Sequence, residues 1–123
     1  MILADTSIWV DHFRSGVDAL AERLVAGEIL IHPCVIGELA LGNLARRDTI
    51  LSTLAQLPRA PVATDDEMLR FIGANRLAGV GIGYVDAHLL ASVRLSADAR
   101  LWTRDRRLLG VAEDLGVAIR PPG

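Results

Sequence analysis

Short apolar runs alternate along the chain with longer segments in which apolar residues recur every three or four positions. The short runs are typical of strands, and they lie at residues 1–4, 28–33, 60–64, 99–103 and 117–120. The longer segments predict helices, and they lie at residues 6–13, 18–27, 34–43, 46–57, 65–78, 84–96 and 104–116. Because strands that alternate with helices form βαβ units, we predict an α/β fold, a three-layer α/β/α sandwich with a mainly parallel central sheet.

Several residues at the predicted boundaries favour the ends of helices. Thr6 or Ser7 is the expected N-cap of the first helix, and Thr64 is the expected N-cap of the fifth. Pro33 suits a first helical turn, where its missing N–H leaves no bond unmade, and Gly27 suits the position just after a helix. These signals agree with the periodicity of the apolar positions.

The size and composition indicate one domain with its own core. The chain has 123 residues, of which 51% are hydrophobic, so we expect residues 1–123 to form a single domain. Cys34 is the single cysteine, which excludes a disulfide framework and a thiolate zinc site. No apolar run reaches the roughly 18 residues of a membrane span, and Asp5 interrupts the apolar start, so we expect a cytoplasmic protein.

The charged residues exclude several classes of protein. The formal net charge of −2 argues against a globally basic nucleic-acid binder but permits a local basic strip. All 13 basic residues are arginine. Haloacid-dehalogenase-like phosphatases, response-regulator receivers and P-loop NTPases each need a lysine, so the sequence excludes these three classes.

Four acidic residues stand in apolar surroundings near the ends of predicted strands. Asp5 ends the first strand, Glu38 lies on the helix after the second, Asp86 lies in the first turn of a very apolar helix, and Asp105 follows the fourth strand. Each has an ordinary explanation: Asp5 and Asp105 could cap helices, Glu38 could be solvated, and Asp86 could interact with the helix dipole. Because sites in parallel sheets lie beyond the carboxyl ends of the strands, the alternative is that all four acids meet there.

A cluster of four carboxylates carries a chemical implication. Crowded carboxylates repel and raise one another's pKa, so a fold retains them most readily where a cation neutralises them. Sites built only from oxygen ligands suit Mg²⁺ or Mn²⁺. Mg²⁺ keeps several waters and takes one or two carboxylates, which leaves the other acids for a second ion, for water activation or for support of the ligands.

Four short segments resemble a known family. They are "LADTSIWVD" at the start, "GELALG" after the second strand, "GYVDAHLLAS" on an apolar helix and "LWTRDRRL" near the end. In this order and spacing they resemble the PIN-domain ribonucleases of the VapC toxin type, over essentially the whole chain. The resemblance implies a Mg²⁺- or Mn²⁺-dependent endoribonuclease, the toxin of a type II toxin–antitoxin pair. It also implies a VapB-like antitoxin as partner, RNA as substrate and a homodimer.

The resemblance also implies which residues form the site. The acids carried over are Asp5, Glu38, Asp86 and Asp105. The hydroxyl groups that would support them are those of Thr103 and of Thr6 or Ser7. Asp5 and Asp86 are the expected metal ligands, and Glu38 or Asp105, where not bound to metal, would orient the attacking water.

Three arginines, Arg104, Arg106 and Arg107, flank Asp105. A guanidinium group matches a phosphate bidentately, so we expect Arg104 and Arg106, ahead of Arg107, to contact the RNA backbone. The alternative for this segment is a solvated turn. Asp11 is expected to be a surface or capping acid.

The alternative for the whole protein is a catalytically silent PIN-like module that binds RNA or another protein.

Overall fold

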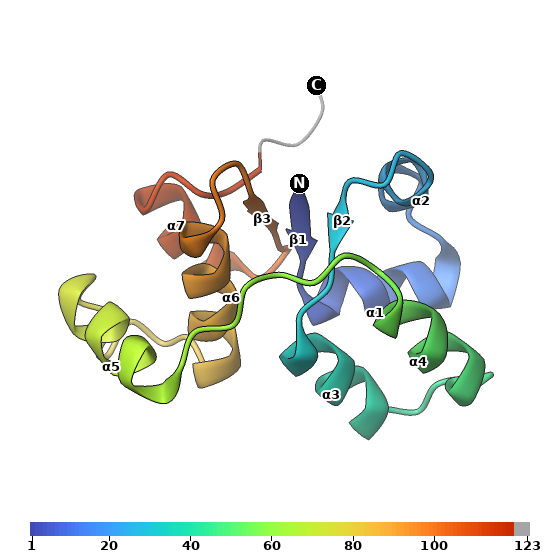
Figure 1. The fold of residues 1–123 in the computed structure, drawn as a ribbon, viewed down its shortest axis with the longest axis horizontal. Helices are drawn as coiled ribbons and strands as arrows, with labels where there is room; N and C mark the ends of the chain where they lie inside the picture. Colours follow the sequence, from blue (N-terminus) through green and yellow to red (C-terminus); the bar gives the residue numbers. More distant parts are fainter. Residues whose placement is uncertain (120–123) are drawn as a thin grey trace.

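Three parallel strands form the centre of the fold (Figure 1). The computed structural model describes residues 1–119. Its strands are β1 (Ile2–Ala4), β2 (Ile29–Leu30) and β3 (Arg100–Trp102), and both pairings are parallel in the order β2-β1-β3. The first strand along the chain is therefore the central one, and Asp5 directly follows its end.

Seven helices surround this sheet within residues 1–119. They are α1 (Thr6–Ser15), α2 (Asp18–Val25), α3 (Pro33–Leu41), α4 (Arg47–Ala55), α5 (Asp65–Ala74), α6 (Tyr84–Leu95) and α7 (Arg106–Asp114). Figure 1 shows α1 to α4 on one side of the strands and α5 to α7 on the other. The predicted α/β architecture with a parallel central sheet is confirmed. Within the described part of the chain, no helix combines the length and the apolar character needed to cross a membrane.

Aliphatic side chains build the core and hold the elements that carry the acids. Leu3 of β1 pairs with Leu101 of β3, and both are fully buried. In α6, all residues from 87 to 93 are buried, and five of these seven are aliphatic, which agrees with the predominantly apolar sequence of this helix. Because the middle of α6 packs inside the protein, its first turn, with Asp86, has a fixed position beside the sheet.

Two predicted strands are absent from the described residues. Residues 60–64 form no strand, and Arg59 makes only a single bridge to Ile31. The ladder cannot continue because the next donor on the β2 side is Pro33, which lacks an N–H and already begins α3. The predicted strand at 117–120 is likewise reduced to one bridge, between Leu101 and Ala118, and Arg120 lies outside the described residues.

Asp5 is the N-cap of α1, so the prediction that Thr6 or Ser7 caps this helix is wrong. The Oδ1 atom of Asp5 accepts a hydrogen bond from the backbone N–H of Ile8 at 3.2 Å. A carboxylate satisfies this free N–H as well as a hydroxyl does, which leaves the two hydroxyl groups for other bonds. The other three boundary signals are confirmed at Thr64, Pro33 and Gly27.

Candidate active site

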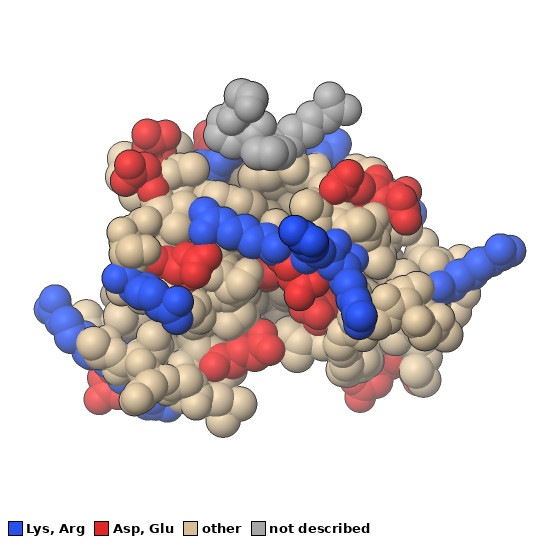
Figure 2. Space-filling model, turned by 180° about the vertical axis from the view of Figure 1, so that it is seen from behind, with Lys and Arg blue, Asp and Glu red and all other residues tan. Residues whose placement is uncertain are grey.

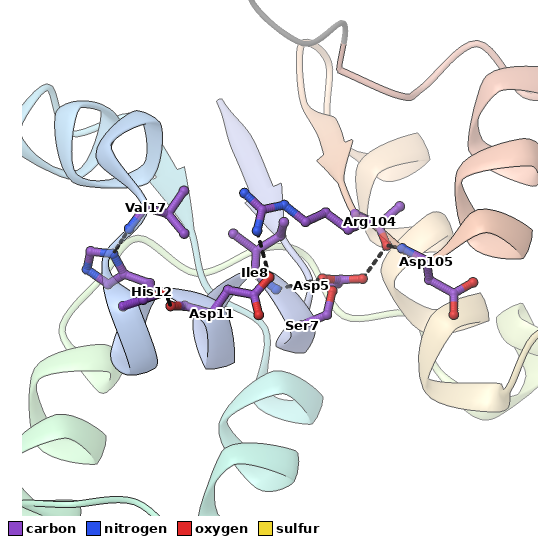
Figure 3. Close-up of polar contacts among 10 residues, drawn as sticks. Asp5, Ser7, Ile8, Asp11, His12, Val17, Arg104 and Asp105 are labelled. Carbon is purple, nitrogen blue, oxygen red and sulfur yellow. Dashed lines mark hydrogen bonds and ion pairs between the residues drawn. The ribbon is translucent and has the colours of Figure 1, made fainter.

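Asp5 lies at the end of the central strand and is almost completely buried, with 5% of its surface exposed. Its Oδ1 accepts hydrogen bonds from the Ser7 hydroxyl at 2.5 Å and from the Ile8 N–H. Its Oδ2 accepts a hydrogen bond from the hydroxyl of Thr103, which follows the neighbouring strand β3. Asp5 therefore both caps α1 and fixes one carboxylate at the carboxyl end of the sheet (Figure 3).

Thr103 connects this carboxylate to Asp105. Its Oγ1 donates to Asp5 and accepts from the backbone N–H of Asp105 at 3.0 Å. The Asp105 side chain accepts from the N–H of Leu108 at 2.9 Å, which makes it the N-cap of α7. Asp105 remains exposed. The acids that follow β1 and β3 thus belong to one hydrogen-bonded network, because their strands are neighbours in the sheet.

Glu38 approaches the same edge from α3. The Thr6 hydroxyl, at the start of α1, donates to its Oε1 at 2.5 Å. Glu38 is exposed, so solvent and a substrate can reach its carboxylate. All three predicted supporting hydroxyls, those of Thr6, Ser7 and Thr103, thus donate to an acid of the set.

Asp86 completes the set from the first turn of α6. It is half-buried, and one of its oxygens, Oδ2, accepts from the backbone N–H of Gly83 at 3.2 Å. Burial raises the pKa of Asp86, and the nearby carboxylates of Asp105, Asp5 and Glu38 raise it further, against the lowering effect of the Gly83 N–H. The four acids therefore lie close enough to influence one another electrostatically.

The chemistry of these donors fits a hard divalent cation. All four offer carboxylate oxygens, the ligands that Mg²⁺ and Mn²⁺ prefer, and a cation would relieve the repulsion at Asp86. Across residues 1–119, however, no three acidic, histidine or cysteine side chains already converge on one point where they could hold an ion. The carboxylates instead face protein donors, so cation binding requires some of them to turn away from their present hydrogen bonds.

The three arginines near Asp105 differ in their surroundings. Arg104 forms an ion pair with Asp11 of α1, with 2.6 Å between Nη1 and Oδ2. Arg107 lies against the backbone of Gly81, since a Cβ atom there would be 2.6 Å from Nη1 of this arginine. Arg106 is exposed and has no ion pair among the described residues. Figure 2 shows a band of arginine side chains across one face, next to acidic side chains near its middle.

Asp11 is the charged residue whose contacts the sequence did not predict. It was expected to be a surface or capping acid, but its carboxylate pairs with an arginine 93 positions further along the chain. A contact over such a distance has no signature in local spacing, because only the parallel pairing of β1 and β3 brings the two segments together.

Comparison with known proteins adds two findings. The family model described as the PIN domain matches residues 2–114. The chain is also 51% identical over 119 residues to a protein called Ribonuclease VapC32 in Mycobacterium tuberculosis, strain H37Rv, and it shows the same identity to the protein of that name in strain CDC 1551. The similarity covers 97% of this chain and 96% of each relative.

Proposed function

Because the chain belongs to the PIN-domain family, as a VapC-type ribonuclease toxin, we propose that it is an endoribonuclease that hydrolyses RNA phosphodiester bonds with Mg²⁺ or Mn²⁺. The observation that carries this proposal is the set of four carboxylates at one edge of the sheet. They come from four separate segments, and the pKa of Asp86 is raised by burial and, to a smaller extent, by the other three carboxylates. Such crowding is unfavourable without a cation and is typical of sites that act on phosphates.

Each acid of the set has its own part in the proposal. Asp5 and Asp86, the two less exposed carboxylates, would hold the cation, and Thr103 keeps Asp5 in place. A bound divalent cation supplies a more acidic water and neutralises charge on the phosphate. Glu38 and Asp105 are exposed, so they would orient the attacking water and accept its proton.

The RNA backbone would be held by the arginines beside Asp105. Arg104 lies in the loop before α7 and Arg106 is the first residue of α7, so each is next to Asp105, and both are exposed. Guanidinium groups there would bind phosphates on either side of the bond that is cut. The rest of the surface keeps the net charge at −2, so RNA attraction would be confined to this face.

A VapB-like antitoxin and a second copy of the chain are the proposed protein partners. An apolar groove with a cavity volume of about 660 Å³ runs beside Glu38 between α1, α3 and the start of α4. Its apolar lining includes Val10, Phe13, Leu39, Leu44 and Ile50. An apolar segment of the antitoxin in this groove would lie next to the acids and block access to them. We expect the toxin, a single domain, to act in the cytoplasm, where its RNA substrates are.

Cleavage of RNA by the purified protein tests the proposal. Wild type is incubated with RNA in Mg²⁺, in Mn²⁺ or in EDTA, and the new 5′ ends are sequenced. Asp86→Asn should reduce cleavage by at least about a hundredfold, because it removes a carboxylate that acts on the reaction. Asp114→Asn, an exposed acid at the end of α7, is the control and should cleave like wild type.

The outcomes separate the candidate functions. Equal cleavage in EDTA and Mg²⁺, or full activity in Asp86→Asn, contradicts the proposed metal-dependent site. If RNA binds but is never cut in either metal, the catalytically silent binding module becomes the correct interpretation.

A further inference from the structure

The side chain of Arg104 bridges the two walls of the acidic site. It starts from the loop between β3 and α7 and ends at Asp11, in the second turn of α1. Figure 3 shows it reaching across the end of β1, where Asp5 lies. The 2.6 Å contact between Nη1 and Oδ2 is that of a close charge-assisted hydrogen bond.

Asp11 is paired with Arg104 in preference to an arginine on its own helix. Arg14 lies three positions after Asp11, a spacing that commonly allows ion pairs on a helix surface. Among residues 1–119, Arg14 nevertheless has no ion pair, and the carboxylate turns to the loop after β3 instead. The pair therefore depends on how the two sides of the site come together.

Both members of the pair remain accessible. The Arg104 side chain is 52% exposed and that of Asp11 is 37% exposed. A carboxylate and a phosphate offer a guanidinium group the same kind of partner, two oxygens that share a negative charge. A ligand that brings a phosphate to this face can therefore replace Asp11 without a change of fold.

We propose that Asp11 is an internal substitute for an RNA phosphate, which holds Arg104 over the site until RNA takes its place. The inference rests on the proposed function, since it assigns one subsite of the RNA that the enzyme would cut. Asp11 lies six residues after Asp5, about 9 Å further along α1. The phosphate that Arg104 receives is accordingly a neighbour of the scissile phosphate, and Asp11 weakens RNA binding by competing with it.

Equilibrium binding of a fluorescein-labelled, mixed-sequence single-stranded RNA tests this inference. The titrations follow fluorescence anisotropy in EDTA, so that no cleavage is needed. Asp11→Asn keeps the shape of the side chain but removes its charge, and it should lower the Kd about two- to fivefold, which corresponds to the loss of a half-exposed ion pair. Asp114→Asn removes the same charge far from the pair and should leave the Kd unchanged.

A double-mutant cycle and a salt titration test whether Asp11 affects RNA binding through Arg104. Arg104→Gln should raise the Kd and reduce the slope of log Kd against log salt by about 0.7, the value for one lost phosphate contact on a single strand. Adding Asp11→Asn to Arg104→Gln should have no further effect.

Several results overturn the inference. They are an unchanged or higher Kd in Asp11→Asn, an equal gain in Asp114→Asn, or a full gain from Asp11→Asn in the absence of Arg104. Because these measurements are made without metal, a failure of cleavage in Mg²⁺ and Mn²⁺ would contradict the proposed hydrolysis and leave the test of Asp11 intact.

Discussion

We predict that His32 makes the protein less stable at acidic pH. Its ring is completely buried at the start of α3, where Nδ1 accepts from the N–H of Cys34 at 3.0 Å. Its Nε2 has no partner among the described residues, and the ring of His88 on α6 lies 5.8 Å away. Burial lowers the pKa of His32 from 6.5 to about 4, with smaller contributions from His88 and from Arg59 beside β2.

The sign of the effect follows from proton binding in the two states. Below pH 6.5 the unfolded chain protonates His32, whereas the folded protein does so only near pH 4. The contribution of His32 to stability is therefore complete above pH 6.5 and is lost as the pH falls toward 4. A difference of about 2.5 pKa units at 1.36 kcal/mol each gives a full loss of about 3 kcal/mol, of which about 2 kcal/mol is reached at pH 5.

Urea unfolding at pH 7 and pH 5, followed by circular dichroism, measures this loss. His32→Asn retains an acceptor for the Cys34 N–H but has no proton to take up. Between pH 7 and pH 5 the free energy of unfolding should fall in both proteins. The fall in wild type should exceed that in the variant by about 2 kcal/mol. His12→Asn is the control, because His12 Nδ1 also accepts a backbone N–H, that of Val17. If wild type and His32→Asn lose the same free energy, the explanation based on His32 is refuted.

Three further predictions concern the site and its supports. Thr103→Val should lower the free energy of unfolding in urea by about 1–3 kcal/mol, because it leaves buried partners unsatisfied, and Thr103→Ser should restore it. Mg²⁺ at a hundred times its Kd should stabilise the protein by about 2.7 kcal/mol, seen as a higher melting temperature that Asp86→Asn abolishes; no rise in wild type contradicts metal binding to the free protein. Gly79→Ala and Gly81→Ala should each lower the free energy of unfolding in the same assay, because both glycines have a positive φ that strains a residue with a Cβ atom; no loss in either variant would contradict these backbone conformations.

The sequence was sufficient to predict the parallel sheet and the proximity of the four acids. Asp5 and Asp105 follow neighbouring strands, and Asp86 lies in the first turn of a helix whose apolar sequence predicted its burial. The acids could be grouped from topology alone, since strand ends in a parallel sheet share one edge. Their roles in catalysis stay predictions until the variants are measured.

The parts that could not be predicted depend on competition for hydrogen bonds. Asp5, Thr6 and Ser7 could each cap α1. In the structure Asp5 caps the helix, Ser7 donates to Asp5, and Thr6 donates to Glu38, whose position 32 residues later cannot be read from local spacing. The apolar run at 60–64 has the composition of a strand but faces Pro33, which cannot donate to it. Strand and helix propensities describe one segment at a time. A β-ladder or a helix cap also needs a suitable hydrogen-bond partner.

The central place of β1 has a consequence for synthesis of the protein on the ribosome. Asp5 is among the first residues made, yet one of the two hydroxyls that donate to it belongs to Thr103, 98 residues later. At about 5–20 residues per second, a nascent chain spends on the order of 5 to 20 seconds with β1 lacking one neighbour and the acids apart. Partially translated chains therefore lack the assembled set of acids, and an mRNA truncated before the codon for Thr103 encodes a fragment without Asp105 and without the hydrogen bond from Thr103 to Asp5. The order of strands in the sheet thus delays assembly of the four acids until translation has passed this codon.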